Sequence, residues 1–244
     1  MSKTDGLQTR CYIGGYDISG DVSAISSIAD SQNLLDVTGL DKAAIERLPL
    51  LQDGAAAING WFNRSAGQIH AALLASGKVP SADRAVLIPL QTTVGGVCFF
   101  IVAKEANYNV NRGADGSLAV SSEFKANGYG IEWGQMLTAG KRTDASAANG
   151  VSVNGGAQST AGASAVVQVF SLASGDVVPI IQDSANDTDF TAITGLTFAS
   201  VGTGAVPTAQ RLATAAGATI RQYVRIATTG TFTTAIVAAG FKRG

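Results

Sequence analysis

The stretch "AVLIPLQTTVGGVCFFIVAK", Ala85–Lys104, is the part of the sequence that decides the fold. Its two halves, Ala85–Gln91 and Gly96–Lys104, are apolar on both faces, as expected of strands that are covered on two sides. The "TTVGG" between them, Thr92–Gly96, is short and glycine-containing, which is typical of a hairpin connection. The stretch therefore predicts two buried antiparallel strands within a mainly β protein.

The composition fits either a protein whose surface is covered by other subunits or a β-protein of ordinary solubility that is rich in small residues. The chain has 244 residues, of which 46% are hydrophobic and only 14% are charged, and its formal net charge is −1. A charged fraction near a quarter is usual, and charged surfaces normally keep proteins apart. The near-neutral balance carries no electrostatic signature of a nucleic-acid or membrane-surface binder.

The remaining features of the whole sequence limit the cellular location and the cysteine chemistry that we expect. The polar start of the chain and the absence of a long apolar run predict neither a signal peptide nor a membrane span. Two cysteines, Cys11 and Cys98, are too few for a disulfide framework, so we expect free, buried thiols.

Short strands with glycine-rich turns are expected along most of the chain. In "YIGGYDISGDVSAIS", Tyr12–Ser26, Gly14-Gly15 predicts a tight turn between two short strands, and Val22–Ile28 alternates as a half-buried strand. Regular spacing of this kind favours a β-sandwich or β-barrel. The other predicted strands are Ala55–Phe62, Asn107–Asn111, Leu118–Phe124, Ile131–Leu137, Ala165–Leu172, Val177–Gln182, Gln210–Thr214, Thr219–Thr228 and Phe232–Phe241.

Two helices are expected. Asp41–Leu48 is short and stops before Pro49. Ser65–Ser76 has Ser65 as a candidate N-cap and an apolar stripe that would cover one face of the sheet.

The predicted domain organisation has three parts. Residues 1–142 form a β-domain with the helix 65–76 on its flank. Residues 143–164 are small, polar and low in complexity, and we expect a linker or an extended arm. Residues 165–244 form a second β-sandwich domain.

No residue pattern points to an enzyme. His70 is the single histidine, and without a recognisable nucleophile and orienting partner it is better interpreted as a surface or subunit-contact residue. The loop "QDSANDTDF", Gln182–Phe190, could hold calcium through its carboxylates, but Asp, Asn and Ser are also the residues of a plain β-turn. Neither a P-loop nor a dinucleotide-binding glycine motif occurs. We therefore expect no catalytic, cofactor-binding or metal site.

One strand carries a candidate contact face. In Thr219–Thr228, Arg221, Tyr223 and Arg225 alternate with an apolar set and project to the opposite side. Arginine and tyrosine are enriched at protein interfaces, although an ordinary exposed sheet face would look the same.

Three stretches together resemble the major tail tube proteins of long-tailed, non-contractile bacteriophages. They are Tyr12–Ser26, Leu34–Asn63 and Ala218–Arg243. The resemblance rests on short motifs, listed here: Asp17–Gly20, Asp36–Thr38, Ala43–Arg47, Leu48-Pro49, Gly54 and Trp61–Asn63.

The resemblance implies a structural function without an active site. Proteins of this family have a β-barrel or sandwich core and form rings, typically hexameric, which stack into a tube for genome delivery. Implied partners are further copies of the chain, the tape-measure protein, and the tail-terminator and tail-tip proteins, with DNA passing transiently. The implied location is the virion tail, after assembly in the host cytoplasm. Candidate assembly residues are Tyr12, Tyr16, Asp17 and Ile18, in addition to Arg221, Tyr223 and Arg225.

In this interpretation, a neighbouring copy as well as the chain's own fold would hold the N-terminal β-element. Two alternatives remain open. One is a capsid decoration or minor tail protein, and the other is a carbohydrate-binding adhesin sandwich. Trp61 and Trp133 lie in apolar segments, which disfavours the exposed aromatic platform that an adhesin needs.

Overall fold

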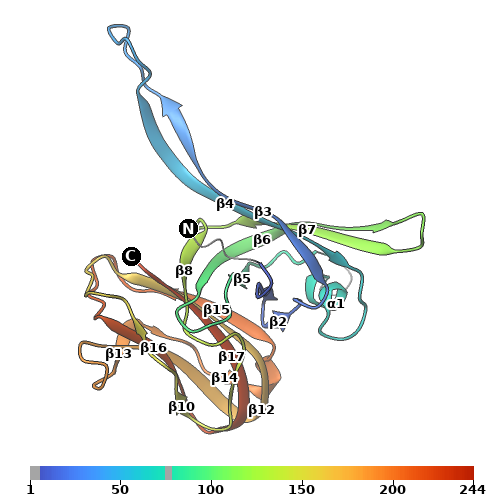
Figure 1. Cartoon of the computed structure of the whole chain (residues 1–244), viewed down its shortest axis with the longest axis vertical. Helices are drawn as coiled ribbons and strands as arrows, with labels where there is room; N and C mark the ends of the chain where they lie inside the picture. Colours follow the sequence, from blue (N-terminus) through green and yellow to red (C-terminus); the bar gives the residue numbers. More distant parts are fainter. Residues whose placement is uncertain (1–5, 75–78) are drawn as a thin grey trace.

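The computed structural model describes residues 6–74 and 79–244 and shows a mainly β protein (Figure 1). Within the described residues there is one α-helix, α1 (Ile69–Leu73), and one 3-10 turn, η1 (Thr203–Ala205). No helix there combines the length and apolar character that a membrane crossing needs. The strands are β1 (Tyr12–Ile13), β2 (Tyr16–Asp17), β3 (Val22–Asp36), β4 (Arg47–Trp61), β5 (Arg84–Pro89), β6 (Val97–Arg112), β7 (Leu118–Ala126), β8 (Glu132–Met136), β9 (Arg142–Asp144), β10 (Ala148–Asn149), β11 (Val153–Asn154), β12 (Ala163–Ser184), β13 (Thr191–Thr197), β14 (Val201–Gly202), β15 (Thr208–Ala213), β16 (Tyr223–Thr229) and β17 (Phe232–Arg243).

The predicted hairpin is confirmed as β5 and β6. The two strands pair antiparallel from Arg84–Ala103 to Pro89–Cys98, so Thr92–Gly96 lies in the connection. Side chains on both faces of this hairpin are fully buried, because one core lies on each side: Val86, Ile88, Phe99 and Ile101 on one, Leu87, Cys98 and Phe100 on the other. Both cysteines are free and buried, as expected.

The N-terminal β-element is held by its own chain. Gly14 and Gly15 have φ angles of 58° and 86°, the conformation that a tight hairpin turn requires and that glycine adopts without strain. β1 pairs with β2 and also with β5. Tyr12, Ile13 and Ile18 are buried, so the order of this element needs no neighbouring copy.

A four-stranded sheet forms most of the first half, in the order β3–β4–β7–β6. α1 packs on its inner face through Ile69, Ala72 and Leu73. Two of the three shifts in register between β3 and β4 lie between Val22 and Ile28, and these bulges place Val22, Ile25 and Ile28 together against the core. The simple alternation expected for Val22–Ile28 is therefore wrong in detail.

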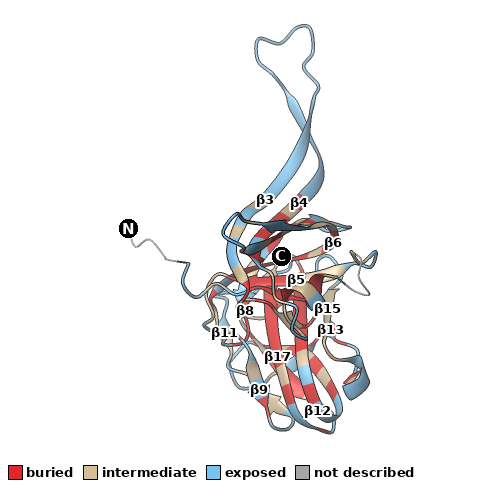
Figure 2. Ribbon diagram, turned by 90° about the vertical axis from the view of Figure 1, so that its right-hand side faces the viewer, coloured by how far each residue is buried: buried red, intermediate tan, exposed pale blue. Residues whose placement is uncertain are grey.

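The second half is a β-sandwich built around one long strand. β12 pairs with β15 and β17 over its first part and with β16 and β13 over its last part, so it belongs to both layers. The sequence predicted two separate strands here. An apolar core fills the space between the layers, and β12 and β17 are largely red in Figure 2.

Residues 143–164 contain short strands rather than a free linker. β9 pairs with β17, while β10 and β11 pair with β16. The segment was expected to be a linker or an extended arm, and its small residues lie along the sandwich. The division of the chain into domains stays a prediction.

A continuous ladder joins the two halves, because β8 pairs with both β6 and β17. The side chain of Gln168, fully buried on β12, adds two bonds across the junction. Its Oε1 accepts the N–H of Gly15 at 2.6 Å, and its Nε2 donates to the carbonyl of Ala85 at 2.9 Å. A third apolar cluster, which includes Tyr12, Phe100 and Val166, fills the junction.

The helix predicted at Ser65–Ser76 is shorter than expected. α1 begins after Gln68, and residues 75–78 lie outside the described residues. The distant Asp21, rather than Ser65, caps the helix, because its Oδ2 accepts the N–H of Ile69 at 2.9 Å.

The helix predicted at Asp41–Leu48 is wrong. Residues 37–46 form the loop at the end of a hairpin, and Arg47 and Leu48 already belong to β4. Eight residues are too few for a stable helix without tertiary contacts.

Candidate assembly surfaces

A long β-hairpin projects from the body of the protein (Figure 1). We define this arm as residues 31–53, the distal parts of β3 and β4 with the loop between them. The arm is exposed, as the pale blue colour shows in Figure 2. Both of its faces carry apolar side chains. Leu35 opposes Leu48 on one face, and Leu34 opposes Pro49 on the other, where Leu51 is 84% exposed. A two-stranded ribbon of this kind is marginally stable alone, so the arm needs a partner.

The tip of the arm, residues 36–46, is an ordered loop. The carboxylate of Asp36 accepts the N–H of Thr38 at 2.9 Å and its hydroxyl at 2.6 Å, which lowers the pKa of Asp36. The Thr38 hydroxyl in turn accepts the N–H of Glu46 at 2.9 Å, and Glu46 pairs with Lys42 at 3.4 Å. Val37, Leu40 and Ile45 remain exposed on this loop.

The four-stranded sheet has two unpaired edges, judged over the described residues. β3 pairs with β4 alone, so its outer edge is free along its whole length. On the opposite side of the sheet, β5 ends at the pair Arg84–Ala103, so residues 104–112 of β6 pair only with β7. Unpaired edge N–H and C=O groups recruit further strands.

The outer face of this sheet carries mostly small side chains, together with Trp61 and the ion pair of Lys125 with Glu123 at 2.7 Å. The core side chains of β4 and β7 point inward, and alternate residues therefore point away from the core. These outward residues are exposed or half-buried: Ala55, Ala57, Asn59, Ala119, Ser121 and Glu123.

A groove runs beside β3 at the root of the arm. Its volume is about 570 Å³, and Val22, Ile25, Ile28 and Leu90 supply the apolar part of its lining. Arg10 supplies its charge and has no ion pair among the described residues.

The four candidate assembly residues near the N-terminus differ in their exposure. Tyr12 and Ile18 are buried and have no surface to offer in the folded chain. Tyr16 and Asp17 are half-buried, and Asp17 pairs with Lys141 at 2.5 Å. Burial raises the pKa of Asp17, but the hydrogen bonds from Lys141 and Ser19 outweigh it and lower that pKa overall. A role in assembly stays a prediction.

The alternation predicted around Arg221, Tyr223 and Arg225 is confirmed, and all three are half-buried. Contacts within the chain occupy both arginines. Arg221 forms an ion pair with Asp183 at 2.5 Å, and Arg225 stacks on Phe190 at 3.9 Å. Their use as a subunit interface stays a prediction. The opposite face is buried through Ile220, Val224 and Ile226.

A buried polar cluster lies where the β6–β7 ribbon leaves the body. The Glu105 carboxylate is fully buried and pairs with Arg84 at 3.1 Å. Burial raises the pKa of Glu105 to about 7, partly offset by Arg84 and by the Ser122 hydroxyl. Nearby, the His70 ring bonds to the Tyr108 hydroxyl at 2.9 Å and so ties α1 to β6. His70 is thus a half-buried packing residue.

The polar side chains of the candidate calcium loop form hydrogen bonds within a turn. In the loop of residues 182–190, the Asn186 Oδ1 accepts the N–H groups of Thr188 and Asp189 at 3.1 and 3.0 Å, as in a side-chain-stabilised turn. The described residues hold no group of three His, Cys, Asp or Glu side chains placed to share a metal ion.

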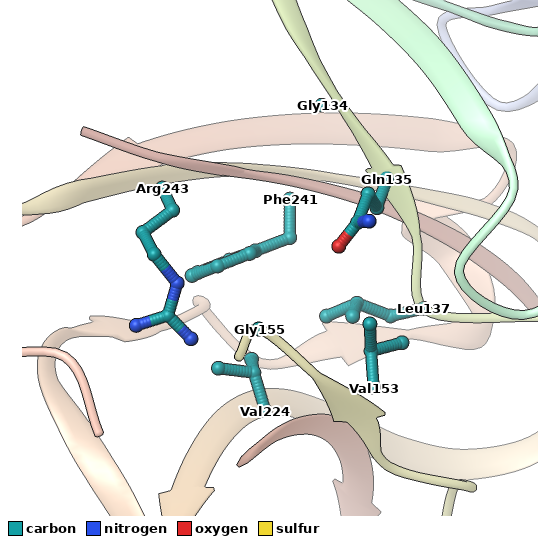
Figure 3. Close-up of a pocket in the computed structure, with 8 residues that line it drawn as sticks. All are labelled: Gly134, Gln135, Leu137, Val153, Gly155, Val224, Phe241 and Arg243. Atoms are coloured by element: carbon teal, nitrogen blue, oxygen red, sulfur yellow. The ribbon is translucent and has the colours of Figure 1, made fainter. Parts of the chain in front are cut away.

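A small cavity of about 170 Å³ lies between the sandwich layers (Figure 3). The Phe241 ring lies between Arg243 and Gln135, above Leu137 and Val224. The Arg243 guanidinium already donates to the carbonyls of residues 220, 221 and 222. The residues that line the cavity include no nucleophile or acid–base pair.

Sequence reasoning missed the arm and the groove. The available signal was the run Leu34-Leu35 opposite Leu48–Leu51, which is apolar without a helical period. Trp61 and Trp133, expected in apolar strands, are 55% and 40% exposed.

The sequence matches no known family model and no curated protein. Two solved structures have related shapes. The Dit protein (gp 19.1) of SPP1, titled a paradigm of the hub adsorption apparatus in Gram-positive-infecting phages, has 9% identity over 96% of this chain and 99% of its own, with a TM-score of 0.38. The phage P2 baseplate in its activated conformation has 10% identity over 98% and 99%, with a TM-score of 0.33. Both scores are below 0.5, so these likenesses establish neither a shared fold nor a shared function.

Proposed function

We propose that this protein is a structural component of a phage tail that assembles into closed rings, and that the rings stack into the tail tube. The observation that supports this function most is the pair of unpaired edges on opposite sides of one sheet, β3 on one side and distal β6 on the other. A β3 edge on one copy and a β6 edge on the next form a heterologous contact, which gives a ring when the rotation closes.

In such a ring the outer face of the sheet would line the lumen. The alanine, serine and asparagine side chains on that face leave room for a passing polymer. Lys125 on that face is paired with Glu123 at 2.7 Å, and this balance of charge suits a genome conduit, because basic walls would hold DNA through its phosphates.

The partners, location and symmetry in this proposal come from the sequence resemblance. Its partners would be the tape-measure protein inside the tube and the terminator and tip proteins at its ends. Its location would be the virion tail, after assembly in the host cytoplasm. The hexameric symmetry is also part of this proposal.

The test compares two alanine-to-proline variants of the purified protein by negative-stain electron microscopy. Ala106 is an exposed bulge residue without a register partner on β7, in the segment of β6 whose other edge is unpaired, so Ala106→Pro should hinder edge pairing. Ala114 follows Gly113 in the exposed β6–β7 turn, where proline is tolerated. We expect tubes from the wild type and from Ala114→Pro, and monomers from Ala106→Pro.

A wild-type protein that stays monomeric at high concentration, with or without a tail-tip nucleator, would contradict the proposal. Rings that never stack would instead indicate a single-ring component of the tail. Circular dichroism of each variant checks that it is folded.

A further inference from the structure

A cleft lies between the two halves of the protein, where the arm leaves the body. It consists of two cavities, of about 410 and 230 Å³, and both are lined by Glu132 and Lys242. The larger cavity is bounded by the arm root at Leu51 and by the β7–β8 connection, and the smaller one by residues 161–164 and 213–216 of the sandwich. Boundaries between structural units are a preferred place for ligand sites.

The carboxylate that the two cavities share is held rigidly. The Arg211 Nε donates to the Glu132 Oε2 at 2.7 Å, and the Arg211 Nη2 donates to the Glu132 Oε1 at 2.7 Å. The Ser164 hydroxyl also donates to Oε1, at 2.7 Å. The side chains of Glu132 and Arg211 are only 9% and 8% exposed. Oε2 receives one of these bonds, so it can accept a further hydrogen bond from a group in the cleft.

Tyr129 supplies an aromatic face to the larger cavity. The guanidinium carbon of Arg211 lies 3.6 Å from the centre of the Tyr129 ring and covers one face of it. Tyr129 is nevertheless 49% exposed and lines the larger cavity, so its opposite face is open. The C–H groups of a sugar ring pack well on such a face, because the aromatic quadrupole attracts polarised C–H groups.

Lys242 is the charged group of the cleft that has no partner. It is half-buried, and its ammonium forms no ion pair or hydrogen bond within the described residues. Arg211 already balances the charge of Glu132. The side chains that line the cleft therefore carry one positive charge that is not compensated, and a partly desolvated ammonium pairs favourably with an anion.

We propose that this cleft binds an acidic sugar, that is, a pyranose ring that carries one carboxylate. The ring stacks on the open face of Tyr129, a hydroxyl donates to Oε2 of Glu132, and the carboxylate pairs with Lys242. A phosphate monoester, which carries close to two negative charges at neutral pH, fits less well beside the Glu132 carboxylate. The inference goes beyond the proposed function and does not depend on it, because one chain supplies every group of the site.

The first test concerns the charge. Ligand-detected NMR titration of the purified protein compares methyl glucuronide with the uncharged methyl glucoside. The glucuronide should bind about tenfold more tightly, because it adds one ion pair. Lys242→Gln should remove this difference by reducing the affinity for the glucuronide alone. Lys42→Gln, which removes an exposed lysine in the loop of residues 36–46, should bind both probes like the wild type.

The second test concerns the aromatic face. Tyr129→Leu removes the flat ring and should weaken the binding of the glucuronide by about tenfold. Tyr129→Phe is the matched control and should bind like the wild type, because the Tyr129 hydroxyl forms no hydrogen bond among the residues that the structure describes. Circular dichroism checks that each variant is folded.

Three results would overturn the inference. One is a wild-type protein that binds neither probe or binds both equally. Another is a glucuronide affinity that Lys242→Gln leaves unchanged, and the third is a Tyr129→Leu variant that binds like the wild type. Binding is measured whether or not the protein forms tubes, so these results are independent of the test of ring formation with Ala106→Pro.

Discussion

Glu105 is the residue whose protonation matters most to the fold. Its carboxylate is fully buried, and its pKa is about 7 in the folded chain against 4.5 for an ordinary glutamate. The folded state therefore binds its proton more tightly than the unfolded state does. The contribution of Glu105 to stability is therefore greatest below pH 4.5 and is lost as the pH rises through about 7, a change on the order of 3 kcal/mol.

Glu105→Gln should remove this pH dependence, because the amide keeps the hydrogen bonds but does not ionise. Urea unfolding at pH 5 and pH 8, at a concentration too low for assembly, measures the effect. Glu123→Gln, which alters a surface pair with Lys125, should leave the dependence unchanged. Equal pH slopes in wild type and Glu105→Gln would contradict the assignment.

At this scale the sequence was informative where the chemistry is local. The turn at Gly14-Gly15 follows from adjacent glycines, and the alternation around Arg221 follows from the period of a strand. The bonds of Gln168 could not be predicted, because its partner Gly15 lies 153 residues away. The capping of α1 by Asp21 could not be predicted either, because 48 residues separate Asp21 from Ile69.

Among the elements, the arm is the one that the fold does not need. No residue of 31–53 belongs to any of the three apolar clusters of the body. Asp30 and Gly54 are directly paired at its base. An Asn-Gly turn joining these two residues therefore replaces the arm with a tight hairpin.

This armless variant should fold with a free energy of unfolding within about 1 kcal/mol of the wild type, because it loses little buried surface. It should form rings and no tubes. Thermal unfolding and electron microscopy measure the two effects. Loss of folding would show that the arm stabilises the body, contrary to its exposure.

Local signals could not reveal this arm. Leu48-Pro49 is typical of a helix end, and exposed leucines look like core leucines until the partner is known. The prediction divided β12 between Leu172 and Val177, around Gly175, and placed Pro179 inside the second strand. Its pairing to both layers keeps it continuous through these residues.

For the whole molecule, the junction predicts cooperative unfolding. β17 and β6 share β8, and the Gln168 bonds cross between the halves. We expect a single calorimetric transition for both halves.

Gln168→Ala should lower stability by about 1–3 kcal/mol while keeping one transition, because it leaves the buried N–H of Gly15 unpaired. The carbonyl of Ala85 still accepts the N–H of Gly14 at 3.1 Å. Gln222→Ala removes one exposed hydrogen bond to Asn154 and should cost less than about 1 kcal/mol. Two resolved transitions in the wild type would contradict the shared ladder.

The same junction has a mechanical consequence. A hydrogen-bonded ladder and a buried side chain connect the halves, so there is no hinge between them. A force applied to the sandwich is therefore transmitted as shear along β17 and β8 into the sheet. The sandwich would then project from an assembled ring as a rigid unit, at one fixed angle in every subunit. A protein bound to these projecting sandwiches could transmit torque to the wall of the tube.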